Sequence, residues 1–518
     1  MKKTLKRLLC LTLTLAMALL AALATAAAEE KREYNGIDIS KPVELRMFVI
    51  ADAPLNQAKA DEYFKVLNDY TLKTLNMTIK QVYASGNDYQ NNYQLALASG
   101  EKYDLILSAN WLGYSTHAGK GAFMPLDELL PVYAPYMWEQ AASKWENVKV
   151  NGRIYGVPTL RGDRVETAFF YREDLRKKYE LPEIKSMDDI ATYLQAIKDN
   201  EPDLLPSDDS QAMVYGNSFI PLTKYQIIDT MGGRNSNFVI DPANPRKVLN
   251  TIEVPEYKEY MYKMKEFFDK GFWPKDQLSR NDWGVFSVTN GKAAASFVGQ
   301  FWNYAYLVPQ TEEENPGWEL NFVPYCLMNP DSVVAESDPT GSMLSVGRNA
   351  ENPERALMFI DLAHQDETLW RLLNWGIEGV HYVMTDDTRD ESILADPATD
   401  KFNYFSGALF DDPKFYRPLW NQWDGQAALQ EQIEAMVRPN LLNGFVLDTS
   451  LIDIEYTALN NVRIEYGYPL NVGAVEDVDA AYEDYVRRSK EAGLDLCREE
   501  VERQLNAFFD ANGRVPAN

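Results

Sequence analysis

The sequence predicts an α/β protein built from at least two compact units, each with a sheet flanked by helices. Its 518 residues exceed the size that one hydrophobic core usually serves. Segments with strand character alternate with segments of helical periodicity on both sides of a turn-bearing stretch at residues 147–175. Such alternation is typical of mostly parallel sheets covered on both faces. With 46% hydrophobic and 12% aromatic residues, the chain can fill such cores.

The first unit opens with a regular series of strands and helices. An apolar-rich strand at residues 43–50 precedes a helix at 61–75. A strand at 77–83, a helix at 89–99 and a strand at 103–108 continue the series. Ligands of parallel sheets bind beyond the carboxyl ends of the strands, so we expect the loops after these strands to form a site.

A second series begins beyond residue 175. Ser186 and Asp189 match a capping box before a helix at 190–198. Residues 256–270 have the apolar spacing of an amphipathic helix that packs on this second unit.

The chain is then predicted to return to the first unit. A short strand at residues 342–346 precedes a helix at 353–364, for which Asn352 is the expected N-cap and Pro353 the first helical residue. The last helix carries a single apolar stripe. Its members are Leu494, Cys497, Val501, Leu505 and Phe508.

Residues 1–28 have the pattern of a secretory signal peptide. Four basic residues precede an apolar run of about 16 residues, and small residues close the segment. Two A-x-A patterns predict a mature start at Ala27 or Glu29. An uncleaved anchor is the rival interpretation, although so short a run is few residues for a membrane span. Cys10 lies at the beginning of the run, so we do not expect a lipid anchor there.

The charge and the cysteines narrow the class of protein. The formal net charge is −26, which would repel phosphate backbones, so we expect no nucleic-acid partner. Beyond the leader only Cys326 and Cys497 remain, and we expect buried thiols rather than a disulfide framework.

Metal and cofactor signatures are weak. The three histidines, His117, His364 and His381, lack the spacing of a zinc site. The acidic run at residues 386–400 lacks the spacing of a calcium loop. We therefore predict no metal site and no cofactor.

The stretch at residues 147–175, NVKVNGRIYGVPTLRGDRVETAFFYREDL, combines a tight turn with extended backbone. Asn151 and Gly152 suit a hairpin turn, and Pro158 forces Val157 out of the helical region. The stretch resembles the interlobe crossover of extracellular solute-binding proteins of ABC importers, in which NGKIYGVP followed by YYRKDL recurs.

Further segments strengthen this resemblance. Residues 288–302, VTNGKAAASFVGQFW, resemble the family's GKAAM strand. Residues 376–382, GIEGVHY, are similar to the NYGIEGKHY of a carbohydrate-type subgroup, and residues 444–513 resemble that subgroup's C-terminal helical domain of unknown function. Since the matches run in order over nearly all of residues 40–513, the chain is identified as a member of family 1 of these receptors.

The resemblance implies a two-lobed, periplasmic-binding-protein-like fold with an added C-terminal helical module. We expect the parts to divide as follows: residues 1–28 as signal peptide, 29–157 and about 335–376 as lobe 1, 158–334 and about 377–443 as lobe 2, and 444–518 as the module.

The resemblance also implies the function. We expect a monomeric extracytoplasmic receptor, secreted and held at the cell surface or in a periplasm. It would capture a carbohydrate, in particular an oligosaccharide, by closure of its lobes and deliver it to the membrane subunits of an ABC permease. A receptor for a peptide or another small solute is the alternative. A secreted carbohydrate-active enzyme has less support, because no catalytic pattern stands out among the 77 acidic residues.

A saccharide site needs aromatic platforms and polar side chains beside them. The aromatic candidates, of which about half would serve packing alone, are Trp111, Tyr114, Trp283, Trp302, Trp375 and Tyr382. The polar candidates are Asp52, Arg161, Asp163, Asn303, Glu378 and His381. For Asp52 a hydrogen bond within its own turn, and for His381 a structural role, are equal alternatives.

Overall fold

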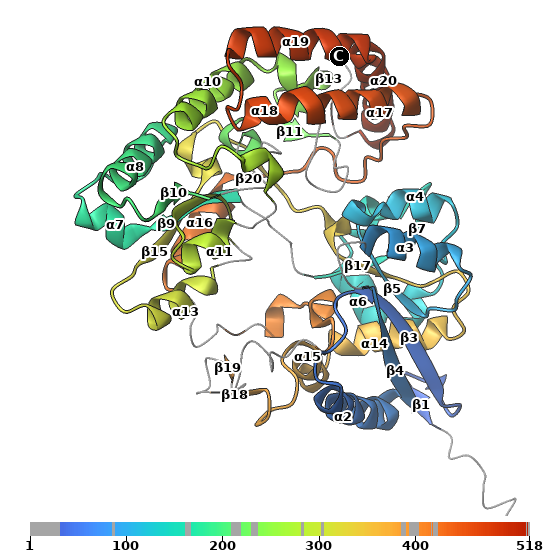
Figure 1. Cartoon of the computed structure of the whole chain (residues 1–518). Helices are drawn as coiled ribbons and strands as arrows, with labels where there is room; N and C mark the ends of the chain where they lie inside the picture. The colour runs from blue at the N-terminus through green and yellow to red at the C-terminus, as the bar shows by residue number, and fades with distance from the viewer. Residues whose placement is uncertain are drawn as a thin grey trace, which may run out of the picture.

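The chain forms two lobes joined by segments that cross between them (Figure 1). One lobe contains the N-terminal strands, and the other carries the C-terminal helices on its outer side. The computed structural model describes residues 32–84, 89–160, 167–208, 219–228, 237–280, 284–301, 305–384, 390–392, 404–415, 417, 423–513 and 515.

The sheet of the first lobe has five strands in the order β4-β3-β5-β17-β8. Strand β3 is parallel to β4 and β5, whereas β17 is antiparallel to β5 and β8. The predicted strands therefore form. They are β3 (Val43–Ile50), β4 (Met77–Ala84), β5 (Leu105–Ser108), β8 (Val157–Pro158) and β17 (Met343–Ser345).

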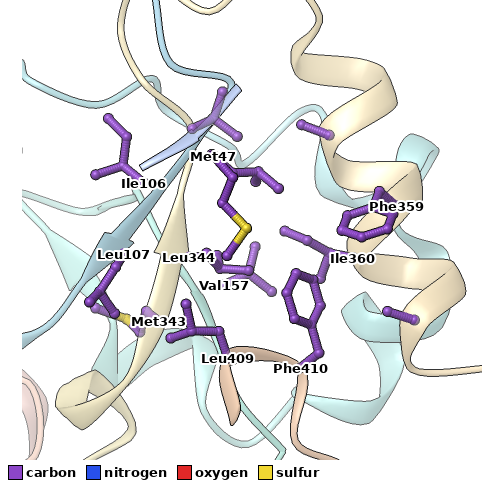
Figure 2. Close-up of a cluster of buried hydrophobic side chains, with 14 of the residues drawn as sticks. Met47, Ile106, Leu107, Val157, Met343, Leu344, Phe359, Ile360, Leu409 and Phe410 are labelled. Carbon is purple, nitrogen blue, oxygen red and sulfur yellow. The ribbon is translucent and has the colours of Figure 1, made fainter. Parts of the chain in front are cut away.

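Helices cover this sheet and close its core. They include α2 (Gln57–Leu75), α3 (Tyr89–Ala98), α14 (Pro353–Ala363) and α15 (Glu367–Asn374). Figure 2 shows Met47 of β3 and Leu344 of β17 facing Ile360 of α14, with Phe410 beside them. All four side chains are buried.

The boundary between the lobes lies later in the chain than we expected, since Phe410 is buried in the first lobe. Tyr404, Phe405 and Leu409 belong to the same buried cluster of the first lobe. We expected residues 377–443 in the second lobe, but residues 404–410 belong to the first lobe, because their aromatic and leucine side chains fill that lobe's core.

The sheet of the second lobe has the order β10-β14-β9-β15 and is less parallel than predicted. Only β10 and β14 are parallel, and β9 is antiparallel to both of its neighbours. Thr167, the first residue of β9, pairs with Gln300 at the end of β14. A chain that arrives from the other lobe thus enters where β14 and β15 end, and it must run against them. The strands are β9 (Thr167–Arg172), β10 (Leu205–Ser207), β14 (Ala293–Gln300) and β15 (Leu320–Pro324).

The C-terminal module packs on this second lobe (Figure 1). Its helices are α17 (Asp453–Val462), a π-helical turn (Arg463–Gly467), α18 (Tyr468–Asn471), α19 (Val478–Glu491) and α20 (Leu494–Asn512). The buried stripe of α20 ends at Phe509, which lies four residues after Leu505. The predicted Phe508 is only half-buried. The stripe shares one hydrophobic cluster with residues of α10 (Pro255–Asp269) and β13 (Asn244–Asn250).

Local signals in the sequence gave the expected backbone, with one exception. Asn151 and Gly152 have φ angles of 50° and 78° in the hairpin between β6 (Lys149–Val150) and β7 (Arg153–Ile154). The Ser186 hydroxyl accepts the amide of Asp189 at the start of α8 (Met187–Asn200). At α14, however, the side chain of Asn352 forms no cap, and its backbone amide donates to the carboxylate of Asp104 instead (2.8 Å).

None of the helices in the described part of the chain combines the length and the apolarity that a bilayer span requires. Within the same residues, no three His, Cys, Asp or Glu side chains gather as metal ligands would. Cys326 and Cys497 are both buried and lie in different hydrophobic clusters, and no disulfide joins them.

Candidate functional site

The carboxyl ends of β5 and β8 mark the edge at which the chain enters and leaves the first lobe. Met343, the first residue of β17, pairs with Ser108 at the end of β5 and with Pro158 at the end of β8. The chain therefore leaves the lobe after Pro158 and returns just before Met343 at the same edge. This is the edge at which parallel sheets present ligand-binding loops.

Three segments connect the lobes, and we name them by their order in the chain. The first crossover starts at residue 159 and ends before Thr167, the second comprises residues 336–342, and the third starts at residue 411 and ends before Gly425; of these, residues 161–166, 416 and 418–422 lie outside the described part of the chain. The first contacts both of the others: the Thr159 amide donates to the Ser342 carbonyl, and the Leu160 amide donates to the Asp411 carbonyl, each over 3.3 Å.

The loop after β5 touches the second crossover. The 3-10 helix η1 (Asn110–Leu112) brings the half-buried Trp111 to this place, and its indole Nε1 donates to the Gly341 carbonyl over 2.9 Å. Beside it, Asn110 Nδ2 donates to Asp338 Oδ2 over 2.9 Å. Trp111 therefore lies at the predicted edge, with its N–H engaged by the crossover.

Two polar candidates are exposed near this edge. Asp52 lies in the loop after β3, and Glu378 lies in the loop after α15. The second loop packs near the first turns of α2. The evidence is the His381 imidazole, which interacts electrostatically with Glu62 and Lys59 of that helix. The structure thus brings the Asp52 and Glu378 loops to the same end of the first lobe.

His381 has structural contacts that account for its burial. Its Nδ1 accepts the backbone amide of Ile377 over 2.8 Å, and its ring meets Tyr63 and Tyr404 edge-on. Burial lowers the pKa of this imidazole from its usual value. Nδ1 must be unprotonated to accept a hydrogen bond from the amide. Burial and this hydrogen bond therefore both favour the neutral imidazole.

The remaining aromatic candidates of the first lobe differ in exposure. Tyr382 is buried, and its ring centroid lies 6.4 Å from that of the half-buried Trp375. Tyr114 is a core residue: its ring stacks on Phe123, and its hydroxyl donates to the Val148 carbonyl over 2.7 Å. Trp375 keeps surface available for a ligand, whereas Tyr114 and Tyr382 are covered by protein.

Five candidates lie outside the described residues. They are Arg161, Asp163, Trp283, Trp302 and Asn303. The placement of the other seven was predictable in part, since each follows a strand or helix that the sequence indicates.

Sequence reasoning missed the residues that hold the crossovers. Lys144 donates from Nζ to the carbonyls of Thr159 (2.7 Å) and Leu160 (3.1 Å). No periodic pattern distinguishes Lys144 from a surface lysine. Asp338, in contrast, precedes Pro339, and an Asp-Pro pair is a turn signal that could have indicated a fixed point in the chain.

A cluster of His364, Asp412 and Lys414 holds the start of the third crossover; the first two side chains are buried, and that of Lys414 is partly exposed. His364 Nδ1 and Lys414 Nζ each lie 3.5 Å from Asp412 Oδ2, and Lys414 also donates to the hydroxyl of Tyr136 and the carbonyl of His364. Burial works against the charged carboxylate, yet the nearby His364 ring, the backbone amide of Lys414 and the charge of Lys414 lower the pKa of Asp412. Burial lowers the pKa of His364. This group binds the chain at residues 412–414 to the end of α14.

Comparison with known families decides the relationship. The family model described as bacterial extracellular solute-binding protein matches residues 65–376. The chain belongs to this family. A second model, a domain of unknown function, matches residues 441–510, which make up most of the C-terminal module.

One relative of this solute-binding protein matches along nearly the whole chain, and another matches along about half of it. A carbohydrate ABC transporter substrate-binding protein of Streptococcus pneumoniae is 23% identical over 489 residues, which cover 90% of this chain and 91% of the relative. The polygalacturonan/rhamnogalacturonan-binding protein YtcQ of Bacillus subtilis is 24% identical over 265 residues, about half of each chain.

Solved structures share the two-lobed fold. The N-glycan transport solute-binding protein NgtS of Streptococcus pneumoniae superimposes with a TM-score of 0.76 at 21% identity, over 91% of this chain and 99% of that one. The alginate-binding protein AlgQ2 gives a TM-score of 0.64 at 19% identity, over 90% and 98% of the two chains. These likenesses confirm the predicted fold class.

Proposed function

We propose that this protein is the extracytoplasmic receptor of an ABC importer and that it captures an oligosaccharide between its lobes. The observation that carries the proposal is the end-to-end match to a carbohydrate ABC transporter substrate-binding protein, which spans both lobes and the C-terminal module. The structures of NgtS with Man1GlcNAc and Man5GlcNAc support an oligosaccharide in particular. The ligand is then handed to the membrane subunits of a permease.

The geometry of the first lobe supports a site at the edge with the crossovers. The carboxylates of Asp52 and Glu378 are exposed, and a carboxylate accepts hydrogen bonds from sugar hydroxyls. Trp111 and Trp375 are both half-buried aromatic residues, the residue type that stacks on a sugar face. A ligand that touches both lobes stabilises the closed arrangement, because only that arrangement makes both sets of contacts.

The remaining parts of the proposal follow from the family. A secretory leader at residues 1–28 would export the chain, and the mature protein would act as a monomer outside the cytoplasm. The relatives are binding proteins, and the proposed role needs no catalysis. The second candidate is a receptor for peptides or other small solutes on the same fold, since a fold alone does not fix the ligand.

Thermal unfolding with a panel of ligands tests the proposal. The panel contains mannose-GlcNAc glycans, pectic oligosaccharides and short peptides. A ligand at 100 times its dissociation constant should add about 2.7 kcal/mol, which raises the Tm of a lobe by several degrees. A shift with a glycan series supports the sugar receptor, whereas a shift with peptides alone favours the second candidate and overturns the first.

Substitutions then test the site. Trp111→Ala should weaken glycan binding roughly fivefold, the loss of about 1 kcal/mol of ring contact. Trp318 is the matched control, since its ring lies on the Arg172 guanidinium (3.5 Å) at the opposite end of β9 from the crossovers. Equal affinities for wild type and Trp111→Ala would remove Trp111 from the site.

A further inference from the structure

The second crossover passes from one lobe to the other within a single residue. On the side of the second lobe, β16 (Val334–Ala335) pairs with β20 (Val437–Arg438), and the Glu336 amide continues the ladder by donating to the Arg438 carbonyl over 2.9 Å. Val334 is buried in a cluster of that lobe. The chain is therefore attached to the second lobe as far as Glu336.

The next fixed point belongs to the first lobe. Asp338 Oδ2 accepts Asn110 Nδ2, and its Oδ1 accepts both the amide (2.8 Å) and the hydroxyl (2.7 Å) of Thr340. Pro339 restricts Asp338 to extended backbone, and the observed φ of −74° and ψ of 117° lie in that region. From Asp338 onward the chain is therefore held by the first lobe.

Ser337 lies between these two fixed points. Its hydroxyl oxygen is buried and has no hydrogen-bond partner in the described part of the structure. We propose that Ser337 is the pivot of the second crossover and that the described residues 159–160, 338–342 and 411–415 move with the first lobe. In one respect the inference rests on the proposed function, namely that the lobes move relative to each other when ligand binds.

The other two crossovers follow the same division. Lys144 fixes Thr159 and Leu160 to the first lobe, and the second lobe begins at Thr167 of β9. The group of His364, Asp412 and Lys414 fixes the start of the third crossover to the first lobe. On the other side, Trp423 packs against Phe301 and Phe322 of the second lobe, with ring centroids 5.9 Å apart in both pairs.

Hydrogen bonds between the crossovers make them one unit. The bonds from Thr159 to Ser342 and from Leu160 to Asp411 join all three segments beside the first lobe. Lobe movement therefore cannot be spread along the second crossover. It is concentrated at Ser337, while Asn110 and Lys144 act as positioning residues that keep the rest in place.

Interlobe distances measured without ligand test the pivot. Spin labels at Lys65→Cys in α2 and Lys185→Cys before α8 report on the two lobes, since both lysine side chains are 75% exposed and the native Cys326 and Cys497 are buried. Ser337→Gly should broaden the distance distribution, because glycine adds backbone freedom at the pivot. Ser342→Gly is the matched control and should leave the distribution unchanged, because the first lobe already holds that residue.

A second pair of variants tests the pivot by removing a side-chain hydrogen bond. Asn110→Ala removes the bond to Asp338, lengthens the free part of the crossover and should also broaden the distribution. Asn349→Ala, which removes a surface bond to the Gly100 carbonyl in the same lobe, should not. Equal broadening in a variant and its control, or wild-type distributions for Ser337→Gly and Asn110→Ala, would overturn the inference. Failure of the proposed function would show separately, as a wild-type protein that binds no glycan.

Discussion

Replacement of Leu505 by alanine tests whether the C-terminal module and the second lobe share one core. Leu505 is 0% exposed in α20, within a cluster that includes buried residues of α10 and β14. Truncation of a buried leucine costs about 2–5 kcal/mol. For a lobe of about 250 residues, roughly 3 kcal/mol lowers the Tm by about 6–12 °C. Calorimetry of the purified protein measures this loss.

Amide hydrogen exchange then shows where the loss is felt. A shared core predicts that Leu505→Ala lowers the protection of β14 in the second lobe as well as that of α20, while β3 in the first lobe keeps its protection. Leu496→Ala is the control, because Leu496 lies on the same helix but is 49% exposed, and it should change stability by less than about 0.5 kcal/mol. Loss of protection confined to the C-terminal helices would refute the shared core.

Two further substitutions test buried carboxylates. Asp104→Ala should destabilise the first lobe by roughly 2–4 kcal/mol in urea unfolding, because the backbone amides of Arg46 and Asn352 lose their acceptor; a loss below about 1 kcal/mol would contradict this role. Burial raises the pKa of Asp361 to about 6 from a usual value of 3.8, so the folded state binds more protons between these values and the carboxyl makes stability fall as pH rises from about 4 to 6. Asp361→Asn should remove this component, so the free energy of unfolding of the variant minus that of wild type should rise by roughly 2–3 kcal/mol between pH 4 and 7. A difference that does not depend on pH would show that Asp361 does not titrate in this range.

Local signals allowed the sequence to predict most elements of the fold. The strand at residues 43–50 has the bounds that its apolar run indicates, and the hairpin forms where Asn151 and Gly152 permit positive φ angles. The direction of β9 was not predictable in the same way, because it depends on the edge at which a crossover enters the second sheet. Helical spacing alone also left open whether Phe508 or Phe509 completes the stripe of α20, since three and four residues both return to one face.

The candidate site was harder to predict because exposure depends on tertiary packing. Trp111 and Tyr114 follow the same strand and are three residues apart, yet one is half-buried beside a crossover and the other is enclosed by Phe123 and Val148. Both are aromatic residues after a strand end, so sequence pattern cannot separate them. The residues that hold the crossovers, such as Lys144, are recognised only when chain segments distant in the sequence come together.

The two attachments, of the module to the second lobe and of the crossovers to the first, have a joint consequence for binding. A hydrophobic cluster common to α20, α10 and β14 moves as one body, so the module accompanies the second lobe in any movement of the lobes. The crossovers accompany the first lobe, if the pivot lies at Ser337. A substitution within the module can then alter ligand affinity only by changing the second lobe's surface or its stability, whereas a substitution at Asn110 or Lys144 changes the range of lobe positions. Affinity and interlobe distance, measured on the same variants, separate these two causes.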